Sequence, residues 1–168
     1  SRGLGDVYKR QKEHTTVMVD LNGDYTGYMT DMTRVFSLGS IPQLALDAHQ
    51  CSIDICRMFE REALPGVEAK VLHSMIEDMV RERGLERYFM GHRQHAGFVG
   101  HGLGIEINEL PVIAPRSRAI LEENNMVALE PKFVIPEVGA VGIENTYHIT
   151  ADGARSITNA PEEIIPFI

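Results

Sequence analysis

The sequence predicts an α+β fold, because its extended segments and its helical segments run in separate blocks along the chain. Residues 15–21 (TTVMVDL) are β-branched and apolar, Asn22-Gly23-Asp24 supplies turn chemistry, and residues 25–36 (YTGYMTDMTRVF) resume an extended pattern. This arrangement predicts a β-hairpin. Two helical patterns follow. The rest of the chain consists mainly of short extended pieces broken by glycine, at 98–113 and 126–150.

The two helical patterns have recognisable starts and stops. Ser40 is expected to cap the first helix, with Pro42 in its first turn, and Leu64-Pro65-Gly66 ends it. Gly84 ends the second helix. Apolar residues recur at helical spacing in both segments: Ile41, Leu44, Ala48, Cys51, Ile55 and Phe59, then Ala69, Leu72, Met75, Ile76, Met79 and Val80. Such stripes predict packing against a core.

Length and composition limit the possible functions. The 168 residues suffice for one domain with its own core, and no apolar run is long enough to cross a bilayer. The net charge of −8 disfavours nucleic acid and anionic membranes as partners. Cys51 and Cys56 lie five residues apart on a predicted helix, so they are expected to be small buried thiols, as in a reducing, cytoplasmic compartment.

Four carboxylates on otherwise apolar strands suggest a metal site. Asp20 and Asp31 lie on the two arms of the first hairpin. Glu130 and Glu144 lie on the two arms of a second hairpin, which Pro136 to Gly139 would reverse. If the hairpins pack side by side, the four acids converge, and their mutual repulsion would force several to protonate unless cations intervene. Two divalent ions would neutralise four carboxylates.

A histidine motif supplies a fifth candidate ligand. His101 lies in Gly100-His101-Gly102-Leu103-Gly104, where the flanking glycines let the backbone come close to its neighbours and are expected to leave the imidazole accessible. One imidazole and four carboxylates suit Mn, Fe, Co or Zn. Neither the phosphate-binding glycine motifs nor the helical HExxH zinc motif is present in the sequence.

The order and local sequence of these motifs resemble the pita-bread metallopeptidase superfamily, which includes methionine aminopeptidase, Xaa-Pro aminopeptidase, prolidase and creatinase. The resemblance rests on VDLNGDYTGYMTDMTRVFSLG at 19–39, GHGLGIEINELP at 100–111, MVALEP at 126–131 and VGIEN at 141–145, and it covers nearly everything after residue 14. It implies a pita-bread fold, an antiparallel sheet with helices packed on one face.

The resemblance also implies a role for each of the five residues. Asp20 would chelate one metal ion, Asp31 and Glu144 would bridge two ions, and His101 and Glu130 would bind the other. Glu130 and His101 are the expected catalytic residues, with Glu130 relaying a proton. The implied activity is a dinuclear metal-dependent hydrolysis of an amide bond near the N-terminus of a short peptide, with Xaa-Pro peptides as the expected substrates.

Three positions bear on the substrate. Asp31-Met32-Thr33-Arg34 resembles the Xaa-Pro and prolidase branch. Asn108 lies seven residues after His101, where that branch commonly has a histidine, and Gly142 takes the place of an arginine. Asn108 is therefore a candidate substrate-binding residue that can donate a hydrogen bond but cannot carry a proton. These departures keep open a creatinase-like C–N hydrolase or a lyase acting on a small molecule. A non-catalytic binding module is disfavoured because all five ligands are present.

The first eleven residues, SRGLGDVYKRQ, resemble the translated read-through of a sequencing-library adapter. We therefore expect residues 1–11 to be non-native. Residues 12–168 are then expected to be the C-terminal part of a pita-bread catalytic domain whose earlier helices and strands are missing. In the full-length protein, an additional N-terminal domain would help to form the substrate pocket and a homodimer.

Overall fold

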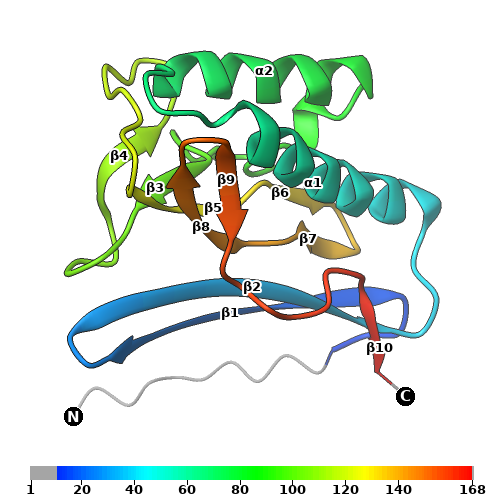
Figure 1. Ribbon diagram of the computed structural model, residues 1–168. Coiled ribbons are helices and arrows are strands. Elements are labelled where there is room, and N and C mark those ends of the chain that lie inside the picture. The colour runs from blue at the N-terminus through cyan, green and yellow to red at the C-terminus, as the bar shows by residue number, and fades with distance from the viewer. Residues whose placement is uncertain (1–10, 168) are drawn as a thin grey trace, which may run out of the picture.

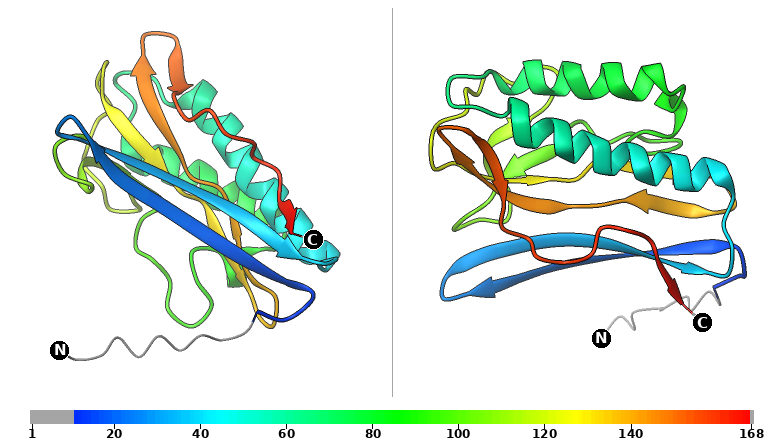
Figure 2. Two further views of the ribbon diagram at one scale, coloured as in Figure 1. Left: turned by 90° about the horizontal axis from the view of Figure 1, so that it is seen from below. Right: turned by 45° about the vertical axis from the view of Figure 1, so that its right-hand side comes forward.

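The computed structural model describes residues 11–167, and its elements form three layers (Figure 1). In chain order they are β1 (Thr15–Tyr25), β2 (Tyr28–Leu38), α1 (Gln43–Glu62), α2 (Ala69–Glu82), the short 3-10 helix η1 (Glu86–Tyr88), β3 (Gly100–Gly102), β4 (Glu109–Ile113), β5 (Met126–Leu129), β6 (Lys132–Ile135), β7 (Gly139–Gly142), β8 (Asn145–Thr150), β9 (Gly153–Ser156) and β10 (Ile165–Phe167). The helices cover one side of strands β3–β9, and the β1–β2 hairpin lies on the other side (Figures 1 and 2). The predicted α+β architecture is confirmed.

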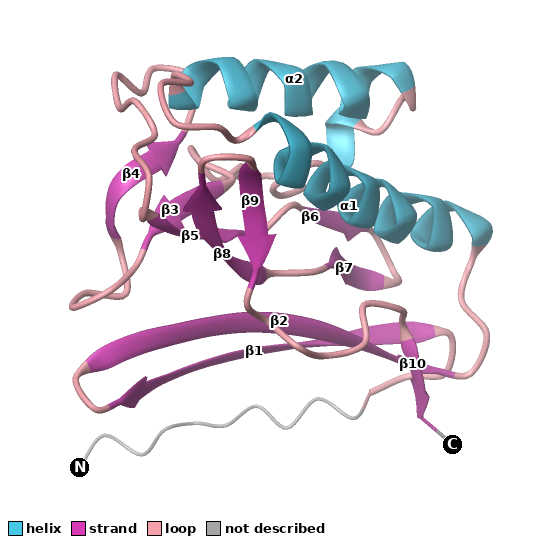
Figure 3. Cartoon of the chain, viewed as in Figure 1, coloured by secondary structure: helices cyan, strands magenta, loops and turns pink. Residues whose placement is uncertain are grey.

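The strands form three sheets, which Figure 3 shows in magenta. Five strands pair in the order β4-β3-β5-β8-β9, all antiparallel. β1 and β2 pair along their whole length, and β10 adds to β2 in parallel. β6 and β7 form a separate two-stranded sheet. The predicted antiparallel sheet with helices packed on one face is therefore confirmed.

The first hairpin forms as predicted, but its turn lies further along the chain. Tyr25 pairs directly with Tyr28, so the turn consists of Thr26 and Gly27, with φ of 54° and 88°. Positive φ at both central residues is the geometry of the type I′ turn, a common two-residue hairpin connection. The prediction of a turn at Asn22-Gly23-Asp24 is wrong, because these residues continue β1. Closing the hairpin at Thr26-Gly27 extends the paired ladder beyond the predicted turn.

The two helices lie close to their predicted bounds, with one error at the start of α1. Ser40 does not cap this helix. Pro42 occupies the cap position, and the Ser40 hydroxyl instead lies 3.2 Å from His14 Nδ1. Gly84 follows α2 with a φ of 65°, which agrees with its predicted role as a stop.

The apolar stripes of both helices pack against the sheet. Phe59 from α1 meets Tyr147 from β8 edge to face, with ring centroids 5.4 Å apart. Cys51 and Cys56 are free and buried, as predicted. No helix within residues 11–167 is long and apolar enough to span a membrane.

The second predicted hairpin is interrupted, unlike the first. Its reversal between Ile135 and Gly139 is confirmed. Each arm is interrupted once, so that β5 and β6 are separated by Glu130-Pro131, and β7 and β8 by Ile143-Glu144. The two glutamates predicted as metal ligands therefore lie at matching breaks in the two arms. Of the segment predicted to be non-native, only Gln11 lies within the described residues, and that prediction stays untested.

Candidate metal centre

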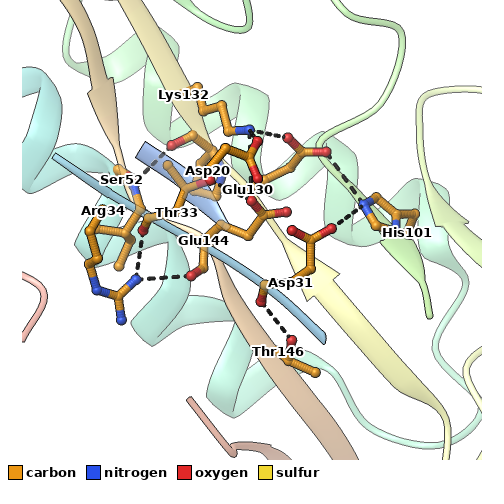
Figure 4. A network of polar contacts seen from close by, with 12 residues as sticks. Asp20, Asp31, Thr33, Arg34, Ser52, His101, Glu130, Lys132, Glu144 and Thr146 are labelled. Atoms are coloured by element: carbon orange, nitrogen blue, oxygen red, sulfur yellow. Dashed lines mark hydrogen bonds and ion pairs between the residues drawn. The ribbon is translucent and has the colours of Figure 1, made fainter. Parts of the chain in front are cut away.

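The pairing register of the first hairpin places its two aspartates on one face. Asp20 pairs with Thr33, and Asn22 pairs with Asp31. Directly paired residues and residues two apart on one strand share a face of the sheet. Both aspartates therefore point toward the second hairpin, as Figure 4 shows. Asp31 is buried, whereas the Asp20 side chain remains 47% exposed.

Backbone pairing brings the other three residues to the same place. His101 in β3 pairs with Ala128 in β5, two residues before Glu130. The Glu130 amide donates a hydrogen bond to the Val99 carbonyl at 2.9 Å. Glu144 exchanges backbone hydrogen bonds with Thr33 of β2. The prediction that the two hairpins pack together and gather four acids is thus consistent with the structure.

The glycines beside His101 permit a close approach of neighbouring strands. A Cβ at Gly100 would lie 2.7 Å from the Ala128 carbonyl, and one at Gly102 would lie 2.3 Å from the Leu110 carbonyl. The expected accessibility of the imidazole is wrong, because His101 is only 3% exposed. It lies on β3, which is flanked by β4 and β5, with the Phe98 ring 5.8 Å away.

The polar atoms of the cluster lie close to one another. His101 Nε2 is 3.9 Å from Asp31 Oδ2 and 3.7 Å from Glu130 Oε1. Ligand atoms of Asp31, His101 and Glu144 all lie within 4.8 Å of each other. His101 Nδ1 donates a hydrogen bond to the Gly102 carbonyl at 3.0 Å, which leaves the Nε2 lone pair directed at the carboxylates.

Burial raises the pKa values of two carboxylates in the cluster. Burial raises the pKa of Glu144 to about 7, although Lys132 and a hydrogen bond from Thr33 oppose the shift. Burial and the nearby Asp20 raise the pKa of Asp31. Asp31 Oδ1 is buried with no hydrogen-bond partner among the described residues. Oxygen donors, one imidazole and an unsatisfied buried oxygen fit a divalent cation.

The sequence is identified by comparison with known families. Residues 6–151 match metallopeptidase family M24. The chain belongs to this family. Family membership implies divalent metal ions, in agreement with the donor set.

Individual relatives of this M24 chain include Xaa-Pro dipeptidases. The chain is 36% identical over 149 residues to YqhT of Bacillus subtilis (strain 168), described as an uncharacterized peptidase, covering 89% of this chain and 40% of that protein. It is 32% identical over 157 residues to the Xaa-Pro dipeptidase of Pyrococcus furiosus, covering 94% of this chain and 43% of that protein. The chain therefore spans about two fifths of the length of these relatives.

Solved structures agree on the fold. The prolidase from Pyrococcus horikoshii OT3 matches 94% of this chain and 44% of its own, with a TM-score of 0.83 and 30% identity. A methionine aminopeptidase from Thermotoga maritima matches with a TM-score of 0.70 at 22% identity, which is a likeness of fold alone. The M24 chain has the pita-bread fold and lies near the Xaa-Pro branch of the superfamily.

Lys132 is part of this M24 site, and the sequence analysis missed it. Its Nζ lies 2.6 Å from Glu130 Oε2, 3.4 Å from Asp20 Oδ2 and 3.8 Å from Glu144 Oε2. Burial lowers the pKa of the Lys132 ammonium, but Glu130 and Glu144 outweigh burial and raise it overall. The available signal was the spacing Glu130-Pro131-Lys132, since residues two apart on an extended segment share a face.

A second group of polar residues holds Glu144 and the adjoining backbone in position through hydrogen bonds. Thr33 Oγ1 donates a 2.6 Å hydrogen bond to Glu144 Oε2. The buried Arg34 guanidinium donates from one nitrogen to the carbonyls of Thr33 and Glu144, at 2.7 and 2.9 Å. The other nitrogen donates to Asn145 Oδ1 at 2.8 Å. The Thr33-Arg34 pair, noted in the sequence only as a branch signature, thus ties the two hairpins together.

Helix α1 fixes the breaks in the second hairpin. The Ser52 hydroxyl donates to the Pro131 carbonyl at 2.7 Å and accepts from the Ile143 amide at 2.9 Å. His49, which the sequence analysis left without a role, accepts a hydrogen bond from the Gly142 amide at 3.2 Å through Nδ1. One face of α1 therefore holds the backbone beside both glutamates.

Gly142 and Asn108, which depart from the pattern of the Xaa-Pro branch, have different surroundings. Gly142 has a φ of 136°, and a Cβ there would lie 2.3 Å from the Pro131 carbonyl oxygen, so this backbone does not accommodate a side chain. Asn108 is exposed between β3 and β4, and no hydrogen bond links it to a metal-ligand candidate within the described range.

A cavity of about 660 Å³ borders Asp31. Apolar residues predominate in its wall, among them Leu21, Met29, Leu103 and Met126.

Proposed function

We propose that the protein is a metal-dependent aminopeptidase or dipeptidase that hydrolyses an amide bond near the N-terminus of short peptides, with Xaa-Pro peptides as substrates. The observation that carries this proposal is the convergence of Asp31, His101 and Glu144 within 4.8 Å, with Glu130 3.7 Å from His101. Membership of family M24 and the likeness to Xaa-Pro dipeptidases support it.

The residues that would hold two divalent ions are Asp20, Asp31, His101, Glu130 and Glu144. As the resemblance implies, the two ions would share Asp31 and Glu144, Asp20 would hold one of them, and His101 and Glu130 would hold the other. Bound Mn, Co, Fe or Zn would supply the Lewis acidity that polarises an amide carbonyl and makes water a better nucleophile.

The protein's own groups provide proton transfer and orientation. Glu130 is only slightly exposed and faces the His101 imidazole, so it is placed to accept a proton and return it to a departing amine. The Gly102 carbonyl fixes the His101 tautomer by accepting from Nδ1. Thr33 orients Glu144 through its hydroxyl. The apolar cavity beside Asp31 would receive a short peptide, and Asn108 is proposed as a substrate-binding residue.

A small-molecule reaction is the second candidate. Gly142 cannot carry the side chain expected for the Xaa-Pro branch, and Asn108 cannot shuttle a proton. Both features favour a creatinase-like C–N hydrolase or a lyase with the same metal centre. A non-catalytic binding module is less well supported, because all five proposed ligands lie together. We further propose a cytoplasmic location and a homodimer.

A substrate panel tests the proposal. The purified protein is loaded in turn with Mn²⁺, Co²⁺, Fe²⁺ and Zn²⁺, and offered Xaa-Pro dipeptides, longer peptides with proline in the second position, peptides without proline, and small C–N substrates such as guanidino acids. We expect cleavage of Xaa-Pro peptides that His101→Ala abolishes. His92→Ala, in an exposed loop, is the matched control and should retain activity.

The outcomes separate the candidates. Turnover of only the small molecules would replace the peptidase with the second candidate. Wild-type turnover by metal-loaded His101→Ala would refute the assignment of the metal centre.

A further inference from the structure

We propose that Lys132 is a resident counter-ion of the carboxylate cluster, so that the divalent ion on the Asp20 side binds only by displacing the Lys132 ammonium. The inference rests on the proposed two-ion centre and adds a residue to it that controls how the centre fills. It makes the two metal positions unequal, with the position beside His101 filled first.

The contacts of Lys132 place its charge where a cation on the Asp20 side would lie. Its Nζ is within 4 Å of an oxygen from each of three carboxylates, at 2.6 Å from Glu130, 3.4 Å from Asp20 and 3.8 Å from Glu144. Figure 4 shows the ammonium at the edge of the cluster, next to the Glu130 carboxylate. A metal ion drawing on the same oxygens would have to compete with the ammonium for them.

The His101 side of the cluster has no comparable cation among the described residues. Asp31, His101 and Glu144 converge there, and Asp31 Oδ1 is buried without a hydrogen-bond partner. A first divalent ion would take Glu130 Oε1, which faces His101, and would leave Glu130 Oε2 to the Lys132 ammonium, so the shortest ion pair of Lys132 stays in place. A second ion must break the pairs that Lys132 makes, and removing one partner from a largely buried ion pair is costly.

The β6–β7 hairpin explains why the cation comes from position 132. Lys132 pairs across the strands with Gly142, which has no side chain to occupy the same face. A side chain at 142 would collide with the Pro131 carbonyl, so only Lys132 can reach the cluster from this pair of residues. Its side chain is one-fifth exposed, which leaves it a route to solvent when displaced.

Charge balance leads to the same order of filling. Four carboxylates and one ammonium carry a formal charge of −3, which a single divalent ion reduces to −1. A second divalent ion makes the same set positive unless Lys132 moves away. The ammonium therefore opposes the second ion more strongly than the first, because the second ion would lie closer to it.

Calorimetric titration of the metal-free protein with Mn²⁺, with bound metal counted by elemental analysis, tests this order. We expect wild type to show two unequal steps. Lys132→Met should strengthen the second step by about tenfold or more, and the first step by a smaller factor, because a positive charge has been removed beside the second position. Lys132→Arg should keep the second step weak.

The matched control is Lys70→Met, which makes the same change at an exposed lysine paired with Glu68 away from the cluster. It should leave both steps unchanged. Equal second-step affinity in wild type and a folded Lys132→Met would overturn the inference while leaving the metal centre intact. Absence of binding of Mn²⁺, Co²⁺, Fe²⁺ and Zn²⁺ by folded wild type would instead refute the proposed function, and this inference with it.

A labelling experiment on wild type avoids dependence on any variant. An amine-reactive reagent is applied to the protein with zero, one and two equivalents of Mn²⁺, and modification of Lys132 is measured by mass spectrometry. We expect labelling to rise only at the second equivalent, when the ammonium is displaced. Labelling that stays constant while two ions bind would contradict displacement.

Discussion

Thr33 and Glu144 are joined by three hydrogen bonds, although they are 111 residues apart in the sequence. The Thr33 hydroxyl donates to Glu144 Oε2 at 2.6 Å, and the two backbones exchange bonds of 3.2 and 3.4 Å. This contact connects β2 with the break between β7 and β8. It fixes both the position of Glu144 and the direction of its carboxylate.

Loss of the Thr33 hydroxyl should therefore weaken the fold and the site together. Thr33→Val is expected to lower the free energy of unfolding by roughly 1–3 kcal/mol, because a buried carboxylate loses its donor. It should also weaken divalent metal binding. Urea unfolding and metal titration measure the two effects. Thr33→Ser keeps the hydroxyl and is the control, and equal stability of the Val and Ser variants would contradict the role of this bond.

The raised pKa of Glu144 predicts a pH-dependent stability of the metal-free protein. The pKa is about 7 in the folded protein against a usual 4.5. Between these values the folded state holds a proton that the unfolded state has released, so stability falls as pH rises. The loss from Glu144 alone is about 2–3 kcal/mol between pH 5 and pH 8.

Denaturant unfolding of wild type and Glu144→Gln across this range isolates that contribution. The difference in unfolding free energy between the two proteins should change by the amount given above, since glutamine does not titrate. A difference that is constant with pH would show that Glu144 has an ordinary pKa.

Gly142 predicts a penalty that combines an unfavourable φ with a collision against the backbone. Gly142→Ala combines a φ of 136° with a Cβ 2.3 Å from the Pro131 carbonyl oxygen. We expect a loss of about 3 kcal/mol or more in unfolding free energy. Gly66→Ala also has positive φ, at 91°, but its Cβ would meet open space, so it should cost only about 1 kcal/mol. Equal losses would show that the backbone at 142 can relax.

Metal binding should raise the thermal stability of the protein. An ion that binds only the folded state stabilises it by about 2.7 kcal/mol at a free concentration of 100 times Kd. We expect the Tm to rise with added Mn²⁺ and to return to the metal-free value with a chelator. His101→Ala should lose most of this rise, and the exposed His92→Ala should keep it. An unchanged Tm after metal removal confirmed by elemental analysis would contradict the clustered site.

Local sequence was sufficient to predict both helices and the two hairpins, and to single out the proposed metal ligands, but not strands β9 and β10. Asp20, Asp31, Glu130 and Glu144 could be picked out because carboxylates on apolar strands need a partner, and Pro136 to Gly139 marked a reversal that the structure confirms. Such signals are local, since they depend on residue type and spacing within one segment.

Pairing between segments could not be predicted in the same way. Asn22-Gly23-Asp24 has turn-forming residues but continues β1, because the hairpin closes at Thr26-Gly27 with the longer ladder. The burial of His101 follows from the position of β3 between β4 and β5 and from Phe98, neither of which the glycine-rich motif reveals.

The sequence by itself determined which residues are available for metal chemistry, and the resemblance assigned each of them a role. Only the tertiary structure decided that Lys132 stands among the carboxylates, that the Gly142 backbone opposite it excludes a side chain, and that Asn108 is exposed. The physical reason is that electrostatic and steric interactions depend on distances of a few ångströms between residues remote in sequence. Those distances are set by strand register and by the packing of the two hairpins.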